Sequence, residues 1–345
     1  MFIPLSCPAC REPLAETTSG YRCTGCDAHY AVKEGIPVLL RASDDGLATL
    51  EREYWNERFA RDADHADLHR LYGDADFVHD DWGLLAYLDR VRTMLPPGST
   101  ILEVGTGLGS CAIPLALHHA VRAVVTDVAE RALVLNRRVA ADLSADASVE
   151  YYAADALHLP FADAVFDAVM THAALHHLER PGDAVREMAR CLRPGGLLVL
   201  GYEPNRTVLA PLRWVAGRLR LSERYSRRFV PGRYSVADDE ARGFSPGELT
   251  AWLEQSGLRL EWMTPVWLVG AVLYHVQALV HAVSGRWIAI PARLQRSARA
   301  LDRKLLLRTP AVRRLSFAWS VGARKDGGLG ASSGTSAGHR LSAPT

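Results

Sequence analysis

The middle of the chain alternates between short apolar runs and longer amphipathic segments. Branched aliphatic residues dominate the runs, and apolar residues recur at helical spacing between them. The runs lie at 101–104, 121–126, 149–153, 166–170 and 197–200. Continuous apolar runs of this length are typical of strands buried on both faces of a parallel sheet. The pattern therefore predicts an α/β fold with a doubly wound, mostly parallel sheet.

The N-terminal part of the chain has a different pattern. Residues 1–40 contain short strand-like pieces that glycines interrupt, which is typical of a small ribbon. Residues 41–98 form a predicted helical connector, or cap, that ends in two prolines and a glycine. Within the connector, helices are expected at 47–60 and 82–94, because apolar residues recur there every three or four positions.

Two stretches interrupt the pattern on the C-terminal side, and we expect both to be inserts in a domain that spans 99–325. The first insert, 203–243, is rich in arginine, and the second spans 266–314. Residues 262–285 carry no charge, but a proline, a glycine and a polar stripe favour a strand end plus an amphipathic helix over a membrane span. A last strand is expected at 315–324.

Length and composition indicate how large a core the chain can form, where the protein is located and which part of it is disordered. The chain has 345 residues, of which 48% are hydrophobic, so it can bury one large core and a small appended module. Its start lacks the basic and long apolar regions of a secretory signal, which predicts a cytoplasmic location. Residues 326–345 are rich in glycine, serine and alanine and are predicted to be a disordered tail.

The net charge of +1 conceals an uneven distribution. Residues 1–202 contain 18 basic and 29 acidic side chains, whereas residues 203–345 contain 22 basic and 10 acidic ones. A basic C-terminal half indicates an anionic substrate, a nucleic acid or an acidic membrane surface. Neutralisation of the two halves across a shared interface explains the pattern equally well.

Four of the six cysteines form two Cys-x-x-Cys pairs, Cys7 with Cys10 and Cys23 with Cys26. This spacing predicts a tetrahedral, structural Zn²⁺ site, which a ribbon of about 40 residues needs because its own core is small. Disulfides are disfavoured in a reducing compartment, and thioredoxin-like chemistry would use a single Cys-x-x-Cys. The other two cysteines, Cys111 and Cys191, are expected to be small core residues.

Three acids lie at the ends of three successive predicted strands: Glu103, Asp127 and Asp155. Because the carboxyl ends of parallel strands share one edge of a sheet, their side chains are expected to converge on one cofactor. A glycine loop at 105–109 follows the first strand, and it lets the backbone approach a ligand closely. A carboxylate after the second strand is placed to accept hydrogen bonds from two ribose hydroxyls.

A nicotinamide dinucleotide is the alternative cofactor, since residues 105–110 differ from the Gly-x-Gly-x-x-Gly pattern at one position only. Two features argue against it. The glycines alternate as Gly-x-Gly-x-Gly, and an acid at Asp155 has no role beside a pyrophosphate. Glu103 instead suits a cofactor that carries a cationic ammonium and a sulfonium.

Over residues 95–265 the chain resembles the class I S-adenosylmethionine-dependent methyltransferases. Four linked motifs carry the resemblance: LEVGTGLGS at 102–110, VVTDVAE at 124–130, ADALHLPFADAVFDAV at 154–169 and ALHHLERPGDAVREMARCLRPGGLLVL at 174–200. The resemblance implies a seven-stranded Rossmann-like methyltransferase fold with helical lid inserts. It also implies S-adenosylmethionine as the cofactor.

The resemblance assigns a part of the cofactor to each motif. The methionine moiety would lie against Glu103, Gly105, Thr106, Gly107 and Gly109. The ribose would contact Asp127 and its neighbour Val128, the adenine would contact Asp155 and Ala156, and the sulfonium would lie near Thr171 and His172. Tyr54, Trp55 and Tyr72 of the connector are candidates to cover the cofactor, although aromatic residues at helical spacing more often belong to a core.

Two adjacent histidines are candidates for a general base, His176 and His177, which would add about 10²-fold to a reaction that depends mainly on alignment. One member of such a pair often caps or packs on its own helix. The arginine-rich inserts are expected to cover the acceptor pocket.

The class of acceptor has several interpretations. The ribbon resembles those of some methyltransferases, of ribosomal RNA guanine methyltransferases and of the small activator subunit of tRNA methyltransferases. The motifs HHLERP and RCLRPGG resemble methyltransferases of quinones, lipids and natural products. We therefore expect a small hydrophobic acceptor, with peripheral membrane contact through the basic C-terminal half. An RNA methyltransferase and a non-catalytic, methyltransferase-like partner protein are the alternatives.

Overall fold

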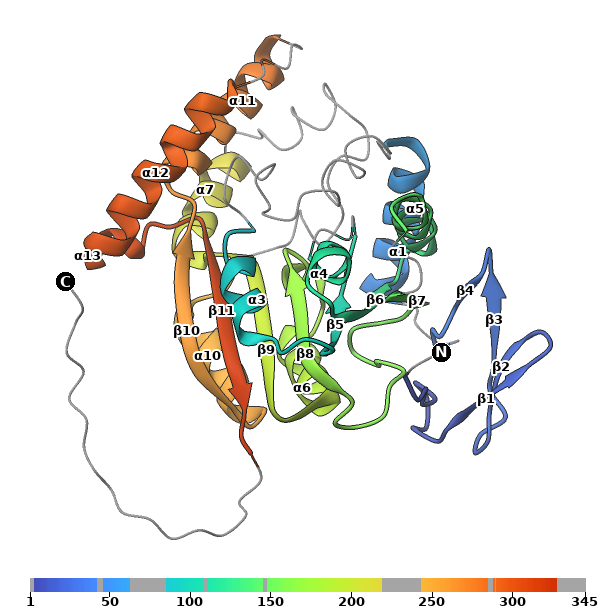
Figure 1. Ribbon diagram of the computed structural model, residues 1–345. Coiled ribbons are helices and arrows are strands. Elements are labelled where there is room, and N and C mark those ends of the chain that lie inside the picture. Colours follow the sequence, from blue (N-terminus) through green and yellow to red (C-terminus); the bar gives the residue numbers. More distant parts are fainter. Residues whose placement is uncertain are drawn as a thin grey trace, which may run out of the picture.

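A seven-stranded sheet forms the centre of the protein in a computed structural model, which describes residues 3–41, 46–62, 85–107, 109, 111–144, 148–218, 243–284, 288 and 290–327 (Figure 1). The strand order is β10-β11-β9-β8-β5-β6-β7. In that order the strands span Leu258–Val266, Ala318–Lys325, Leu192–Pro204, Phe166–His172, Thr100–Val104, Arg122–Asp127 and Val149–Ala153. Only β11 runs antiparallel to its neighbours. The sheet confirms the predicted doubly wound, mostly parallel fold.

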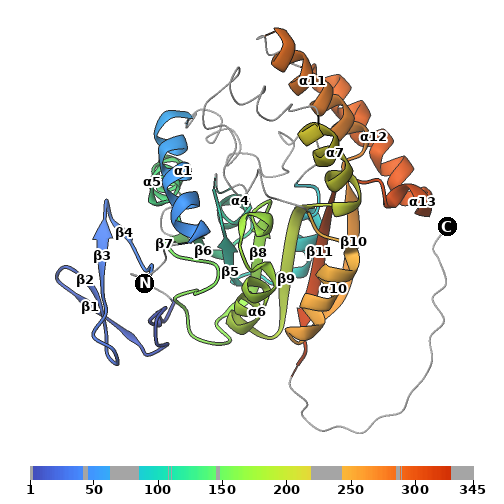
Figure 2. The ribbon, with the colours of Figure 1, turned by 180° about the vertical axis from the view of Figure 1, so that it is seen from behind.

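Helices cover both faces of this sheet (Figures 1 and 2). One face packs against α3 (Leu88–Met94), α4 (Ala112–His118) and α5 (Glu130–Asp142). The other face packs against α6 (Pro181–Cys191) and α10 (Pro246–Gln255). Successive strand residues point to opposite faces, so most strands contribute to two separate hydrophobic clusters.

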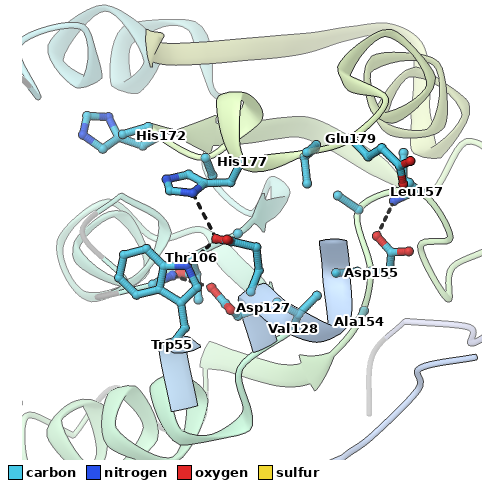
Figure 3. Close-up of a pocket in the computed structure, with 18 of the residues that line it drawn as sticks. Trp55, Thr106, Asp127, Val128, Ala154, Asp155, Leu157, His172, His177 and Glu179 are labelled. Carbon is cyan, nitrogen blue, oxygen red and sulfur yellow. Dashed lines mark hydrogen bonds and ion pairs between the residues drawn. The ribbon is translucent and has the colours of Figure 1, made fainter. Parts of the chain in front are cut away.

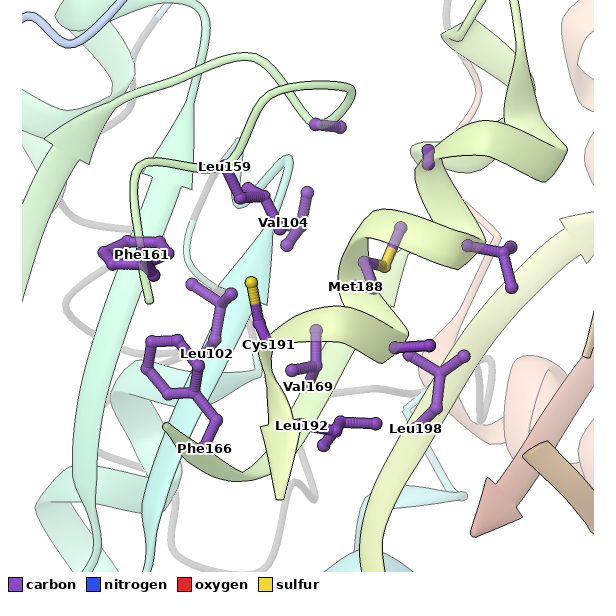
Figure 4. Close-up of a cluster of buried hydrophobic side chains, with 14 of the residues drawn as sticks. Leu102, Val104, Leu159, Phe161, Phe166, Val169, Met188, Cys191, Leu192 and Leu198 are labelled. Atoms are coloured by element: carbon purple, nitrogen blue, oxygen red, sulfur yellow. The ribbon is translucent and has the colours of Figure 1, made fainter. Parts of the chain in front are cut away.

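The cluster on the α6 face illustrates this packing (Figure 4). Leu102 and Val169 project from neighbouring strands, and Met188 and Cys191 project from α6 towards them. Cys191 is fully buried, as expected for a cysteine that serves as a small core residue. Buried apolar contacts of this kind hold the strand ends, and thus the loops that follow them, in fixed positions.

The N-terminal ribbon consists of four antiparallel strands: β1 (Leu14–Thr17), β2 (Gly20–Cys23), β3 (His29–Lys33) and β4 (Ile36–Pro37). The chain then continues to the edge of the large sheet, where the Leu39 N–H donates to the Ala153 carbonyl at 2.8 Å. Arg11 forms a two-pronged ion pair with Glu187 of α6, at 2.6 and 2.9 Å. The ribbon is therefore fixed to the sheet by both backbone and side-chain contacts.

The remaining helices lie above the carboxyl edge or beside the sheet. They are α1 (Leu47–Asp62), the short turn η2 (Leu175–His177), α7 (Arg206–Arg218), α11 (Val269–Ser284), α12 (Ala292–Arg308) and α13 (Pro310–Arg313). No helix in the described ranges is long and apolar enough to cross a membrane. The rest of the first predicted insert, from residue 219 to 242, and the tail from residue 328 lie outside the described residues.

Two predicted boundaries were wrong. A strand was expected at 197–200, but β9 already begins at Leu192. Leu192 pairs with Phe166, and the next pair is Leu197 with Ala168. A bulge in β9 between these pairs contains the two glycines, and β8 and β9 stay paired on both sides of it. Helix α3 begins at Leu88, later than the predicted start at residue 82, and residues 63–84 are not described.

Candidate active site

A cavity of about 490 Å³ lies at the carboxyl edge of the sheet, within the size range of small-molecule sites (Figure 3). Loops after β5, β6, β7 and β8 form its floor, and α1 forms one wall. Of the predicted cofactor residues, those that line it are Gly105, Thr106, Gly107, Asp127, Val128, Asp155, Ala156 and His172. Glu103, Gly109 and Thr171 do not line it.

The loop after β5 requires glycine for steric reasons. Gly105 has a φ of +66°, and a Cβ there would lie 2.8 Å from the Cβ of Ala174. Gly107 has a φ of +48°, and its carbonyl accepts a 2.9 Å hydrogen bond from Asn136. Both angles favour glycine, so the loop exposes backbone to the cavity where other residues would place a side chain.

Asp127, the last residue of β6, is buried beside this loop. Its carboxylate accepts hydrogen bonds from the Gly107 N–H at 2.8 Å and the Ala129 N–H at 2.9 Å. Burial raises its pKa, although these hydrogen bonds act in the opposite direction. Each carboxylate oxygen has a second lone pair, so both can still accept a hydroxyl from a ligand.

Asp155 lies on the opposite side of the cavity from Trp55 and His177, with Asp127 and Val128 between them (Figure 3). One of its oxygens accepts a 3.0 Å hydrogen bond from the Leu157 N–H. The cavity is therefore elongated, with a carboxylate near its middle and another at one end. Asp127 and Asp155 thus line the same cavity at separate points, and their contacts with ribose and adenine stay a prediction.

Glu103 differs from the predicted arrangement of three converging acids. Its side chain is only 1% exposed, and it accepts a 2.9 Å hydrogen bond from the Ala112 N–H at the start of α4. Burial raises its pKa to about 7. The structure thus places two of the three acids at the cavity and uses the third to hold the end of α4.

The two candidate histidines have separate partners. Nδ1 of His176 lies 3.0 Å from Glu203, which also accepts hydrogen bonds from the N–H groups of residues 174–176. His177 lines the cavity, and its Nδ1 lies 3.2 Å from Glu51 of α1. Glu51 also accepts a 3.0 Å hydrogen bond from the Trp55 indole. His176 thus supports the η2 turn, whereas His177 faces the ligand space.

His172 lines the cavity on the side away from Asp155 (Figure 3). Its ring stacks between Tyr87 and Tyr202, and its Nδ1 lies 3.0 Å from the Tyr87 hydroxyl. Burial lowers its pKa to about 4, so the imidazole is neutral at physiological pH. The imidazole that lines the cavity is therefore neutral, and two tyrosines that lie outside the lining hold its ring.

Five residues of α1 line the cavity, and the sequence analysis had named only Trp55 among them. They are Ala48, Glu51, Trp55, Arg58 and Phe59. Their positions recur at helical spacing, which is a visible signal, but spacing alone does not reveal whether a helix faces a core or a ligand. Tyr54 does not line the cavity, and Tyr72 lies outside the described residues.

The four ribbon cysteines gather at one point, with all four sulfur atoms within 4.8 Å of one another. Cys7 and Cys26 sulfurs lie 3.8 Å apart, and those of Cys10 and Cys23 lie 3.3 Å apart. Sulfur atoms bound to a tetrahedral Zn²⁺ at about 2.3 Å would lie about 3.8 Å apart. The donor set and its spacing therefore fit zinc, and four thiolates would leave no open position for catalysis.

Residues 102–200 match a protein-family model described as a methyltransferase domain. The chain is 32% identical to the 27-O-demethylrifamycin SV methyltransferase of Amycolatopsis mediterranei (strain S699), over 46% of this chain and 55% of that protein. It is 37% identical to the demethylmenaquinone methyltransferase of Clavibacter sepedonicus, over 30% of this chain and 40% of that protein. These alignments thus span between two fifths and just over half of the relatives.

Among solved structures, the magnesium protoporphyrin IX methyltransferase of Synechocystis PCC 6803 aligns with 81% of this chain and all of its own, at a TM-score of 0.48 and 18% identity.

Proposed function

We propose, from the premise that residues 102–200 form a class I S-adenosylmethionine-dependent methyltransferase domain, that this chain transfers a methyl group to a small, hydrophobic acceptor. The single observation that carries the proposal is the cavity, which combines a glycine loop with two carboxylates that follow neighbouring strands. Relatives named for rifamycin and menaquinone substrates support an acceptor of this size and polarity.

The residues present fit S-adenosylmethionine. Asp127 would accept the ribose hydroxyls, Asp155 would accept from the adenine amine, and the backbone at Gly105 would approach the methionine end. When bound, the cofactor supplies a methyl group on a positively charged sulfur that is already activated for displacement. The protein then has to align the acceptor and exclude water, and alignment alone contributes up to about 7–11 kcal/mol.

We assign the role of general base to His177 and exclude His176 from it. His177 lines the cavity, whereas Glu203 holds His176 in the supporting turn. Glu51 is the positioning residue, because a hydrogen bond to Nδ1 keeps the proton there and leaves Nε2 able to accept a proton from the acceptor. Such a pair acts only on acceptors that carry an acidic or hydroxyl proton.

The lining of the cavity supports a hydrophobic acceptor over RNA. His172 lines the cavity and is neutral because burial lowers its pKa, so the acceptor would meet an imidazole without a formal charge there. An RNA substrate would require basic side chains along the path to the cavity. Within the described lining, Arg58 is the only basic side chain besides the two histidines.

Binding and turnover test the proposal in sequence. Calorimetry should show one S-adenosylmethionine site per chain, and Asp127→Ala should weaken it by a few-fold to a hundredfold while the protein stays folded. Methyl transfer from labelled cofactor is then measured with a hydroxyquinone, a phenolic polyketide and tRNA. Labelling of tRNA alone would support the RNA alternative, and failure to bind the cofactor would support a non-catalytic partner protein.

We also propose a structural zinc ion in the ribbon, held by Cys7, Cys10, Cys23 and Cys26. The fit of the four sulfur atoms supports this assignment. The ion would stabilise the ribbon, whose buried Tyr21 and Tyr30 pack in a cluster shared with the large sheet and not in a core of the ribbon's own.

A further inference from the structure

Helices α11 and α12 pack against each other beyond the β10 edge of the sheet (Figure 1). Asp302 of α12 fixes the pair, because its carboxylate accepts from the Val269 N–H at 2.5 Å and the Gly270 N–H at 3.2 Å at the start of α11. Ala298 and Leu306 are buried on the inner face of α12. The two helices therefore form a fixed unit whose outer sides face solvent.

The outer sides of this pair carry an unusual number of exposed aliphatic residues. On α11, valines recur at every fourth position and form a stripe, and the first of them is 59% exposed. On α12, the exposed leucines include Leu307 at 56%. The set comprises Val272, Val276, Val280, Leu294, Leu301 and Leu307.

Basic side chains lie between the leucines of α12. Arg293, Arg303, Lys304 and Arg308 are exposed, and no acidic side chain in the described ranges forms an ion pair with them. The only acid among residues 286–314 is Asp302, which is buried against α11. This surface therefore combines uncompensated positive charge with exposed apolar side chains.

A line of aromatic rings runs from His172, which lines the cavity, to Tyr274 of α11. Tyr202 stacks on His172 with ring centroids 5.9 Å apart, Trp267 lies 5.5 Å from Tyr202, and Tyr274 of α11 lies 5.4 Å from Trp267. Tyr202 and Trp267 both have positive φ, at +54° and +66°, which bulky residues rarely adopt. Strained backbone held by packing is typical of sites that position a ligand.

We propose that the outer faces of α11 and α12 bind the surface of a membrane that contains anionic lipids. Helices that combine basic and aliphatic side chains lie in the interface between headgroups and acyl chains, where aliphatic groups insert and arginines contact phosphates. Single-stranded nucleic acid would instead require exposed aromatic rings for stacking, and the exposed large apolar residues of these two helices are aliphatic.

This inference does not require the proposed methyl transfer, but the two fit together. A lipophilic acceptor dissolves in the bilayer, so a docked enzyme would meet it at high local concentration. The aromatic line from Tyr274 to His172 would then link the docked helix α11 to the wall of the cavity.

The test is co-sedimentation of the full chain with vesicles of phosphatidylcholine alone or mixed with one quarter phosphatidylglycerol. Binding should be at least about tenfold tighter to the anionic vesicles and should weaken in 0.5 M salt. The triple variant Arg293→Glu, Lys304→Glu, Arg308→Glu should lose about tenfold or more on anionic vesicles. The triple variant Leu294→Ser, Leu301→Ser, Leu307→Ser should lose binding to a similar extent.

A matched control carries the same change of charge elsewhere: Arg138→Glu, Arg186→Glu and Arg259→Glu. Equal loss in this control, equal binding to neutral and anionic vesicles, or binding to single-stranded RNA without vesicle binding would each overturn the proposal. Calorimetric titration with S-adenosylmethionine should give the same affinity for the α12 variants and the wild type. That readout separates failure at the membrane from failure of the proposed active site.

Discussion

At the scale of single residues, similar side chains have different roles because their surroundings differ. Asp127 and Asp155 face the cavity, whereas Glu103 supports α4. His176 and His177 are adjacent in sequence, yet buried Glu203 holds one and Glu51 of a distant helix contacts the other. Adjacent positions on a tight turn point in different directions, so sequence proximity does not imply a shared role.

The pair formed by His177 and Glu51 leads to a prediction about the pH dependence of turnover. His177→Asn should lower kcat by about 10²-fold with unchanged cofactor affinity. Glu51→Gln removes the charge that stabilises the imidazolium, so the acidic limb of the kcat profile should move to lower pH. Trp55→Phe, which retains Glu51, is the control. An unmoved limb would exclude Glu51 as the positioning residue.

Glu103 leads to a prediction about stability. Its folded-state pKa of about 7 lies above the ordinary glutamate value of 4.5, so the folded protein binds more protons than the unfolded chain between these values. Stability should therefore fall as pH rises from 4.5 to above 7, by up to about 3 kcal/mol. Glu103→Gln should remove this dependence while keeping an acceptor for the Ala112 N–H. Urea unfolding at pH 5.5 and 8 measures the free energy of unfolding of the wild type and the variant. The same change of this free energy with pH in both proteins would contradict the raised pKa of Glu103.

At the scale of elements, α1 closes one wall of the cavity and is held from its other side. Arg52 forms an ion pair with Glu130 of α5, and Asn56 donates to the same carboxylate at 3.0 Å. Burial alone would raise the pKa of Glu130, but these two partners hold it at about 2. The position of α1 over the ligand space thus depends on a charged contact with α5.

Loosening this contact should change how fast the cofactor leaves. Glu130→Gln should speed dissociation of S-adenosylmethionine several-fold in stopped-flow measurements, because Trp55 and Phe59 on α1 line the cavity. Thermal stability should change little, since a partly exposed ion pair contributes about 1 kcal/mol or less. Glu57→Gln on the exposed side of α1 is the control. Equal dissociation rates in all three proteins would show that α1 does not retain the cofactor.

At the scale of the whole molecule, the ribbon and the large sheet share one hydrophobic cluster. Tyr21, Tyr30 and Leu39 of the N-terminal part belong to the same buried group as Phe161 and Leu159 near the cavity loop. The Leu5 backbone pairs with that of Phe161. The ribbon therefore covers an edge of the sheet that would otherwise be open to other strands.

Loss of one cysteine thiolate in the ribbon should separate the role of the ribbon from that of the large sheet and its cavity. Cys23→Ser should release zinc and disorder residues 1–40, while cofactor affinity is largely retained because no ribbon residue lines the cavity. Metal analysis, proteolysis and calorimetry measure the three effects, with Ser19→Ala as the control. A wild-type protein with much less than one zinc per chain would contradict the assignment.

The sequence by itself determined the α/β class, the positions along the chain of the strands that precede or end at Asp127 and Asp155, and the Cys-x-x-Cys pairs of the ribbon. These features depend on local periodicity and spacing, which a chain shows without being folded. Only the tertiary structure decided that α1 walls the cavity, that Glu51 and not another acid meets His177, and that Glu103 turns away from the ligand space. Those outcomes depend on contacts between residues far apart in the chain, and packing selects these contacts among many that the pattern allows.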